Sequence, residues 1–275
     1  MPKSWTKRRV ACLAMLLVAA VTAPAGAQQE ISVDGSTGTA PLVGALGKAF
    51  AAKSNVAVAV GKGLGTKARF EALSAGSIDI AMASHGLNVA QVTGMGMTVH
   101  RIAMTPVVFA VHDSVDVTSL TEAQVCAIYS GGVRNWKELG AADLAVVPLA
   151  RPDSEVDAEV VRGAIACFKD LQLPDSVRIL ARAGDMAKAL AETAGGVGMT
   201  SATVVGQSSG KIKAVALGGV TASEGNVVGG NYRLTRDAFL VTRNAPSSAV
   251  KAFIEFVSGS EGAAVIKANG AIAAK

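Results

Sequence analysis

Short apolar runs alternate with helical segments in the first third of the sequence, and this order constrains the fold more than any other feature. Residues 31–35, 56–63 and 77–84 are short and apolar, as is typical of buried strands. Residues 41–54 and 66–76 carry apolar residues at helical spacing. Strands that alternate with helices form a largely parallel sheet with helices on both faces, so the sequence predicts an α/β fold.

Two further apolar runs, residues 105–112 and 234–242, predict strands that are far apart in the sequence. The residues between them include a predicted helix at 121–131, so we expect a second α/β lobe. A chain that leaves one lobe and returns to it creates a cleft, where α/β proteins bind small ligands. The predicted boundaries are 28–112 plus 231–275 for the first lobe and 113–230 for the second.

The first 27 residues predict a secretory signal peptide, because four basic residues precede an apolar stretch that ends in Ala25-Gly26-Ala27. A transmembrane anchor is the alternative. The apolar stretch from Val10 to Val21 is shorter than the roughly 20 residues that a membrane-spanning helix needs. We therefore expect export to the periplasm.

The net charge of +5 comes mainly from this segment. Removing its four basic residues from the total of 26 leaves 22, against 21 acidic residues in the whole chain. A nearly balanced charge argues against a broad basic surface for nucleic acid or membranes. The aromatic content of 4% leaves few rings for stacking on bases, so we expect no nucleic-acid partner.

Two cysteines, Cys126 and Cys167, remain beyond the signal segment. Two cysteines in an exported protein usually pair, so we expect a disulfide within the second lobe. Two buried thiols are the alternative. Neither cysteine has the histidine partner or the CxxC spacing that metal or redox chemistry requires.

Three loops follow predicted strands of the first lobe, at residues 34–39, 61–66 and 83–86. Their glycines and small hydroxyl residues leave backbone N–H groups and hydroxyls open to an anion. Each loop alone is equally typical of plain helix caps and turns. Loops at successive strand ends converge, however, and their combination indicates an anion site.

Enzyme signatures are missing from the sequence. The glycine loop matches neither the phosphate-binding GxxxxGK[ST] pattern nor the dinucleotide-binding GxGxxG pattern, and there is no GxSxG or HExxH motif. The three histidines occupy unrelated positions. We therefore expect no catalysis, no metal site and no cofactor.

The order of several motifs resembles the PstS-like family, the periplasmic phosphate-binding proteins of ABC importers. The motifs are "DGSTGTAPL", "GKGLGTKARFEALSAGSIDIAMASH", "LTEAQVCAIYSGGVRNWKEL", "GGVGMTSATVV", "GGNYRLTRDAFLVT" and "VKAFIEFVSGSEGAAVIKANG". The resemblance implies a monomer with the two-lobe type II periplasmic-binding-protein fold. Its lobes would close on phosphate or a related small oxyanion and deliver it to an inner-membrane ABC permease.

The resemblance also implies ligand contacts in the first lobe. Thr37 and Gly38 match the family's first loop, and Ser36 is adjacent to them. Thr66 is the hydroxyl residue nearest to Leu64, which stands where a serine is usual. Ser84 matches, whereas the next residue, His85, replaces an aspartate or an arginine of other members.

In the second lobe, Arg151 matches the family's arginine, and it is the expected main charged partner of an oxyanion. The family then reads Asp-Gly-Ser-Gly-Thr, whereas this chain carries Glu155 and Asp157 at the two hydroxyl positions. A carboxylate there would repel an anion by several kcal/mol at about 4 Å and an effective dielectric near 20.

Three interpretations of these two acids stay open. They complement a helix dipole from solvent, with Ser154 and Asp157 as a capping box. Alternatively, one of them pairs with Arg151 and closes the anion site. As a third possibility, they receive a cationic group of a different ligand. The favoured hypothesis is that the chain is a solute-binding protein. The rival hypothesis is a module with lost or altered anion binding that serves as an extracytoplasmic sensor or scaffold.

Overall fold

The computed structural model describes Met1 and residues 29–274, so the predicted signal peptide lies, apart from Met1, outside the described residues. One group of elements comprises β1 (Glu30–Gly35), α1 (Ala40–Ser54), β2 (Ala57–Val60), α2 (Thr66–Ala75), β3 (Ile80–Ser84), α3 (Val89–Gly94), β4 (Met97–His112), β11 (Thr235–Arg243), α9 (Ser248–Ser258), α10 (Ser260–Ala268) and β12 (Ile272–Ala273). The other comprises β5 (Ser119–Leu120), α4 (Glu122–Tyr129), η1 (Trp136–Leu139), β6 (Val147–Ala150), α5 (Val156–Ala164), η2 (Ala166–Phe168), β7 (Arg178–Ile179), α6 (Ala183–Glu192), β8 (Gly196–Ser201), α7 (Ala202–Gly206), β9 (Ile212–Ala214), β10 (Ala216–Leu217) and α8 (Glu224–Val228). We call these groups the first and the second lobe.

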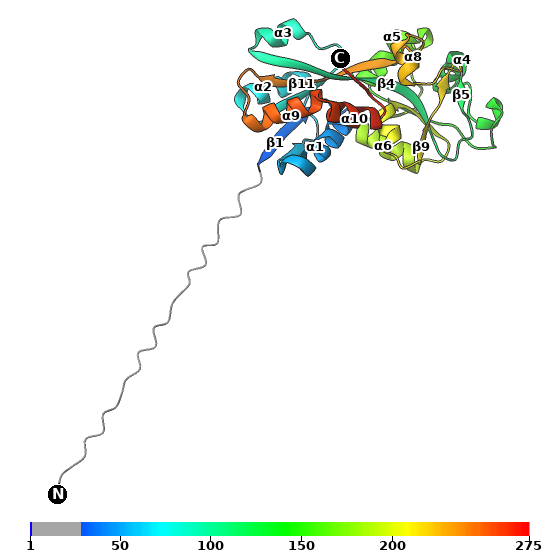
Figure 1. Ribbon diagram of the computed structural model, residues 1–275. Helices are drawn as coiled ribbons and strands as arrows, with labels where there is room; N and C mark the ends of the chain where they lie inside the picture. The colour runs from blue at the N-terminus through cyan, green and yellow to red at the C-terminus, as the bar shows by residue number, and fades with distance from the viewer. Residues whose placement is uncertain (2–28, 275) are drawn as a thin grey trace.

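One long strand, β4, joins the two lobes. The main sheet has the order β2-β1-β3-β11-β4-β8-β6-β7, and β9 and β12 also pair with β4. Pairing is parallel between β1, β2 and β3 and between β6, β7 and β8, whereas β4 runs antiparallel to all its partners. Figure 1 shows β4 passing from the end that carries α2 and α9 to the end that carries α4 and α6. The predicted α/β architecture is confirmed.

Each face of the first-lobe sheet has its own hydrophobic core, because successive side chains of a strand point to opposite faces. Ile80 and Met82 of β3 pack into the core beneath α1 and α9, while Ala81 and Ala83 pack into the core beneath α2. A strand that is apolar at every position is therefore buried on both sides, which is what the continuous run "IAMAS" indicates.

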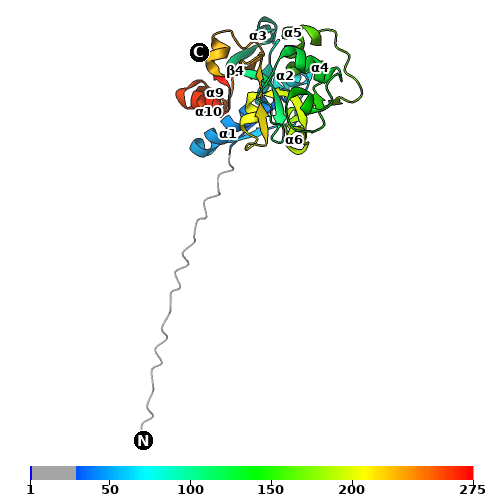
Figure 2. The same cartoon turned by 90° about the vertical axis from the view of Figure 1, so that its right-hand side faces the viewer.

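The second lobe has a separate core around the other half of β4. Phe109 of β4 packs against Tyr129 and Phe168, with ring centroids 5.9 and 6.1 Å away. The hydroxyl of Tyr129 donates to the carbonyl of Leu149 at 2.8 Å, so this buried polar group is satisfied. Burial raises the pKa of the Tyr129 hydroxyl, which keeps it a neutral donor. Figure 2 views the molecule from the end that carries α4 and α6.

The predicted elements agree with the structure in type and order, but three differ in length. The strands predicted at 56–63 and 77–84 are shorter, since β2 ends at Val60 and β3 begins at Ile80. The strand predicted at 105–112 is the second half of β4, which begins at Met97. The predicted lobe boundaries stay a prediction, because β4 contributes Ala103 to a first-lobe core and Val107 to the second-lobe core within one continuous strand.

Candidate functional site

A cleft of about 1020 Å³ lies between the two lobes. Residues 35–37, 62–67 and 84–88 contribute to its first-lobe wall, and residues 154–156 and 181–182 contribute to the facing wall. These segments follow the carboxyl ends of β1, β2, β3, β6 and β7. Ligands of α/β proteins bind at this edge of the sheet, so the cleft is the candidate functional site.

Hydrogen bonds hold the first two loops together and fix the first loop to β3. The Gly63 N–H donates to the Asp34 carboxylate at 2.9 Å, and the Ser36 N–H donates to the Met82 carbonyl at 3.0 Å. Gly35 has a φ of +137°, and a Cβ at this position would collide with the Met82 carbonyl. Glycine is therefore required where the first loop crosses β3.

The polar side chains of the first-lobe wall have different partners. The Thr37 Oγ1 is buried and has no hydrogen-bond partner among the described residues. The Ser84 hydroxyl donates to the Asp237 carbonyl at 3.1 Å. His85 is about half exposed, and its Nδ1 lies 4.0 Å from the Asp237 carboxylate, which Arg101 also contacts at 2.6 Å. Of these three, Thr37 has the buried polar atom without a partner among the described residues.

Arg69 was not recognised from the sequence as a site residue. It lies one turn into α2, lines the cleft and is 8% exposed. Its guanidinium donates to the Met82 carbonyl and to the Thr66 hydroxyl, both at 3.2 Å, and its Nε has no partner among the described residues. Burial lowers the pKa of Arg69, since the charged form loses solvation.

Arg151, in contrast, is 1% exposed and does not line the cleft. Its Nη1 donates to the Leu180 carbonyl at 2.8 Å, and its Nη2 donates to the Glu155 carboxylate at 2.6 Å. Of the three interpretations left open for the two acids, the structure shows the second, in which one of them pairs with this arginine. That the pair closes an anion site stays a prediction.

Asp157 connects Arg151 to a second buried arginine. The Asp157 carboxylate lies 3.9 Å from the Nε of Arg151 and 3.2 Å from the Nε of Arg236. Arg236, at the start of β11, also donates to the Gly38 carbonyl at 2.7 Å. A Cβ on Gly38 would collide with this guanidinium. The three charges link α5 of the second lobe to the first loop of the first lobe.

The interpretation of Ser154 and Asp157 as a capping box is wrong. The N-cap of α5 is Glu155, and no side chain caps this helix end. Asp157 is 3% exposed, so it does not complement the helix dipole from solvent. The arginines take up its charge, and the Glu155 side chain remains 34% exposed at the cleft.

The structure brings six of the predicted site residues into the lining of the cleft and leaves three outside it. The six are Ser36, Thr37, Thr66, Ser84, His85 and Glu155, and the three are Gly38, Arg151 and Asp157. Arg69 follows the glycine loop by one helical turn, and this position was the only sequence signal for its role. Arg236 had no local signal, because its partners are distant in the sequence.

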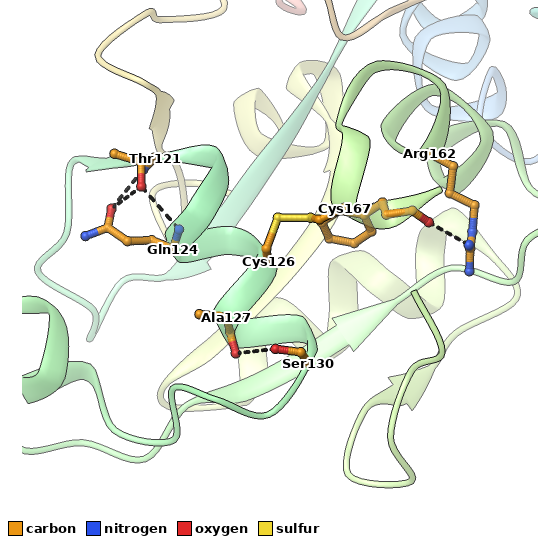
Figure 3. Close-up of a disulfide and its surroundings, with 8 residues drawn as sticks. Thr121, Gln124, Cys126, Ala127, Ser130, Arg162 and Cys167 are labelled. Atoms are coloured by element: carbon orange, nitrogen blue, oxygen red, sulfur yellow. Dashed lines mark hydrogen bonds between the residues drawn. A yellow bond between two sulfur atoms is a disulfide. The ribbon is translucent and has the colours of Figure 1, made fainter. Parts of the chain in front are cut away.

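The predicted disulfide between Cys126 and Cys167 is confirmed. Figure 3 shows it joining helix α4, which the Thr121 and Gln124 capping box begins, to the segment η2. The two Cα atoms are 6.2 Å apart and 41 residues apart in the sequence. The bridge lies within the second lobe, away from the residues that line the cleft.

Residues 29–274 contain neither a candidate metal site nor a candidate membrane span. No group of three or more His, Cys, Asp or Glu side chains in this range is placed to hold a metal ion. No helix in the same range has the length and apolar character to cross a membrane.

Comparison with known proteins agrees with this geometry. A family model described as the PBP superfamily domain matches residues 20–261. The phosphate-binding protein PstS of Bacillus subtilis (strain 168) is 24% identical over 242 residues, which cover 86% of this chain and 77% of the relative.

Solved structures with the same fold include two from phosphate transport. A protein of Clostridium perfringens, assigned as a phosphate ABC transporter substrate-binding protein and solved with bound phosphate, is 26% identical with a TM-score of 0.73. The match covers 90% of this chain and 100% of that one. An ABC-type phosphate transport receptor of Vibrio cholerae is 23% identical with a TM-score of 0.58, over 88% of this chain and 99% of that one. The chain belongs to the PBP superfamily, and its sequence and fold are PstS-like.

Proposed function

We propose that this protein is the exported solute-binding component of an ABC importer, and that it binds phosphate or a related small oxyanion in the cleft. The lobes close on the ligand, and the closed monomer delivers it to an inner-membrane permease without catalysis. The PstS-like relatives support the class of protein. The proposed signal peptide and the disulfide support export to the periplasm, since disulfides persist in oxidising compartments.

The observation that carries the proposal is the composition of the cleft. Its first-lobe wall combines the hydroxyls of Thr37 and Thr66 with the guanidinium of Arg69 at the start of α2. Hydroxyls, an arginine and a helix N-terminus are the donors that anion sites use. The walls also come from two lobes joined by β4 and β11, which is the arrangement that hinge closure requires.

Calorimetric titration of the purified, refolded protein with inorganic phosphate, sulfate and arsenate tests the proposal. Small-angle scattering on the same samples should show a smaller radius of gyration when a ligand is bound. Binding of none of these anions, together with an unchanged radius, would contradict the proposed function. Native mass spectrometry of the protein before refolding would identify a ligand that copurifies.

A second candidate function is favoured by the ion pair of Arg151 and Glu155. An arginine that already holds a carboxylate at 2.6 Å does not need an external anion. Under this alternative the chain is a sensor or assembly module with altered anion binding. Failure of every anion in the titration, with retention of the fold, would favour it.

Replacing Glu155 with Ser should raise the affinity for inorganic phosphate at least tenfold. The variant removes one negative charge from the cleft wall and releases Arg151, and a hydrogen bond to a charged group contributes roughly 1.5–3 kcal/mol. Titration at matched pH and salt measures the change, with Glu192→Ser, outside the cleft, as the control. An unchanged affinity would mean that the Glu155 charge does not reach the bound anion.

A further inference from the structure

Two helices begin in opposite walls of the cleft, and their first turns carry different charges. Helix α2 of the first lobe has no acidic residue in its first turn and no side-chain cap. Helix α5 of the second lobe begins after Glu155 and carries Asp157 and Glu159 in its first turn. A helix N-terminus attracts anions, so the positive end of α5 already has acidic partners whereas that of α2 does not.

Arg69 adds a charge without a carboxylate partner among the described residues to the α2 side, where its Cζ lies 5.1 Å from the centroid of the Phe70 ring. No carboxylate among the described residues lies within 4.0 Å of its guanidinium, although the side chain is buried. Its two hydrogen bonds use two of the five N–H donors of an arginine, and the Nε has no partner. The buried Oγ1 of Thr37, in the same wall, also lacks a partner. Buried polar groups normally have partners, so the Arg69 and Thr37 side chains keep unused hydrogen-bonding capacity in this wall.

The facing wall has the opposite character. Glu155 and Glu159 line it, and Arg182 is its one basic residue among those described. Glu159 makes no ion pair within 4.0 Å with any described residue, and its Oε1 would lie 4.0 Å from a Cβ placed on Gly86 across the cleft. Glu155 already pairs with Arg151, so Glu159 is the carboxylate of this wall without an ion pair to a described residue, and it would attract a cationic group of a ligand when the lobes close.

The size of the cleft also exceeds the needs of a tetrahedral ion. Its volume of about 1020 Å³ is at the upper end of the roughly 300–1,000 Å³ typical of pockets for organic ligands. In the conformation of the structure, an inorganic oxyanion would fill only a small part of this volume, and lobe closure would have to remove the rest. An organic molecule with an anionic group at one end would fill more of it.

From these observations we infer that the cleft binds a zwitterionic organic anion, with its anionic group on Arg69 and Thr37 and its cationic group facing Glu155 and Glu159. The inference rests on the proposed function, since it names the ligand class of the same cleft. It makes Arg69, and not Arg151, the residue that neutralises the anion.

Three probes distinguish the contribution of the ligand's anionic group to binding from that of its cationic group. O-phosphoethanolamine carries a phosphate and an ammonium group, ethyl phosphate has the same anionic group on a neutral tail, and inorganic phosphate has no tail. We expect O-phosphoethanolamine to bind the refolded protein at least tenfold more tightly than ethyl phosphate. Glu159→Gln should reduce this ratio to below threefold, and Glu255→Gln, on the exposed face of α9, should leave it unchanged.

Arg69→Gln should lower the affinity for both organic phosphates at least tenfold, and Arg69→Lys should restore part of that affinity. The exposed Arg178, outside the cleft, provides the matched control Arg178→Gln, which should bind as the parent does. Circular dichroism on each variant verifies the fold, and the lysine variant keeps the comparison informative if Arg69→Gln does not fold.

The results that would overturn the inference differ from those that would overturn the proposed function. Tightest binding of inorganic phosphate, equal binding of the two organic phosphates, or full affinity in Arg69→Gln would exclude the zwitterionic ligand and leave oxyanion binding intact. Binding of none of the three probes to the parent protein would overturn the inference, and it would overturn the proposed function as well if sulfate and arsenate also fail to bind.

Discussion

Replacing Asp157 with Ala should lower the free energy of unfolding by about 3–5 kcal/mol, the range measured when one partner of a buried ion pair is removed. Asp157 is the one carboxylate among the described residues within 4.0 Å of Arg236, and both side chains are 4% exposed. Arg151 would keep Glu155, whereas Arg236 would keep only the Gly38 carbonyl. In the variant, the Arg236 guanidinium would therefore remain buried between the two lobes, with no carboxylate to compensate its charge.

Urea unfolding followed by circular dichroism measures this loss. Asp153→Ala is the matched control, because Asp153 pairs with Arg162 at 2.7 Å while its side chain is 70% exposed. Exposed ion pairs contribute about 0–1 kcal/mol, so the control should lose far less stability. Equal losses in the two variants would show that the Asp157 pair is not desolvated in solution.

Removing the disulfide should have a comparable effect on stability. Cys126 and Cys167 are 41 residues apart, and the entropy of closing a loop of that length corresponds to about 4 kcal/mol at 25 °C. The double variant Cys126→Ser with Cys167→Ser should therefore unfold at a lower urea concentration than the parent. A thiol titration of the denatured, non-reduced parent should find neither cysteine free.

The control for this experiment is the parent protein itself under a reducing agent. Reduced parent and double variant lack the same cross-link, so their free energies of unfolding should agree within about 1 kcal/mol, since exposed or partly exposed substitutions have small effects. A double variant as stable as the oxidised parent would contradict the prediction. Calorimetric titration should also show unchanged ligand binding, because neither cysteine lines the cleft.

The fold was predictable because its signals are local. Apolar spacing in "PLVGALGKAFAAKS" reports one buried helix face, and the continuous run "IAMAS" reports a strand covered on both sides. The loops at residues 35–37 and 62–67 were predictable as neighbours, since parallel strands end at the same edge of a sheet. The sequence predicted only the second half of the long strand β4. The first part, which includes "MTVHRI", was not predicted because it mixes exposed and buried positions.

The charge partners in and behind the cleft were not predictable in the same way. The sequence by itself determined that Arg151 precedes two acids at the start of a helix, and it could not distinguish a solvent-facing acid from a buried one. Only the tertiary structure placed Arg236, 79 positions after Asp157, within 3.2 Å of its carboxylate, and left Arg69 in the cleft wall with no carboxylate of a described residue within 4.0 Å. The reason is physical: periodic burial is a property of one element, whereas the pairing of a charge depends on distances between elements that meet only after the chain has folded.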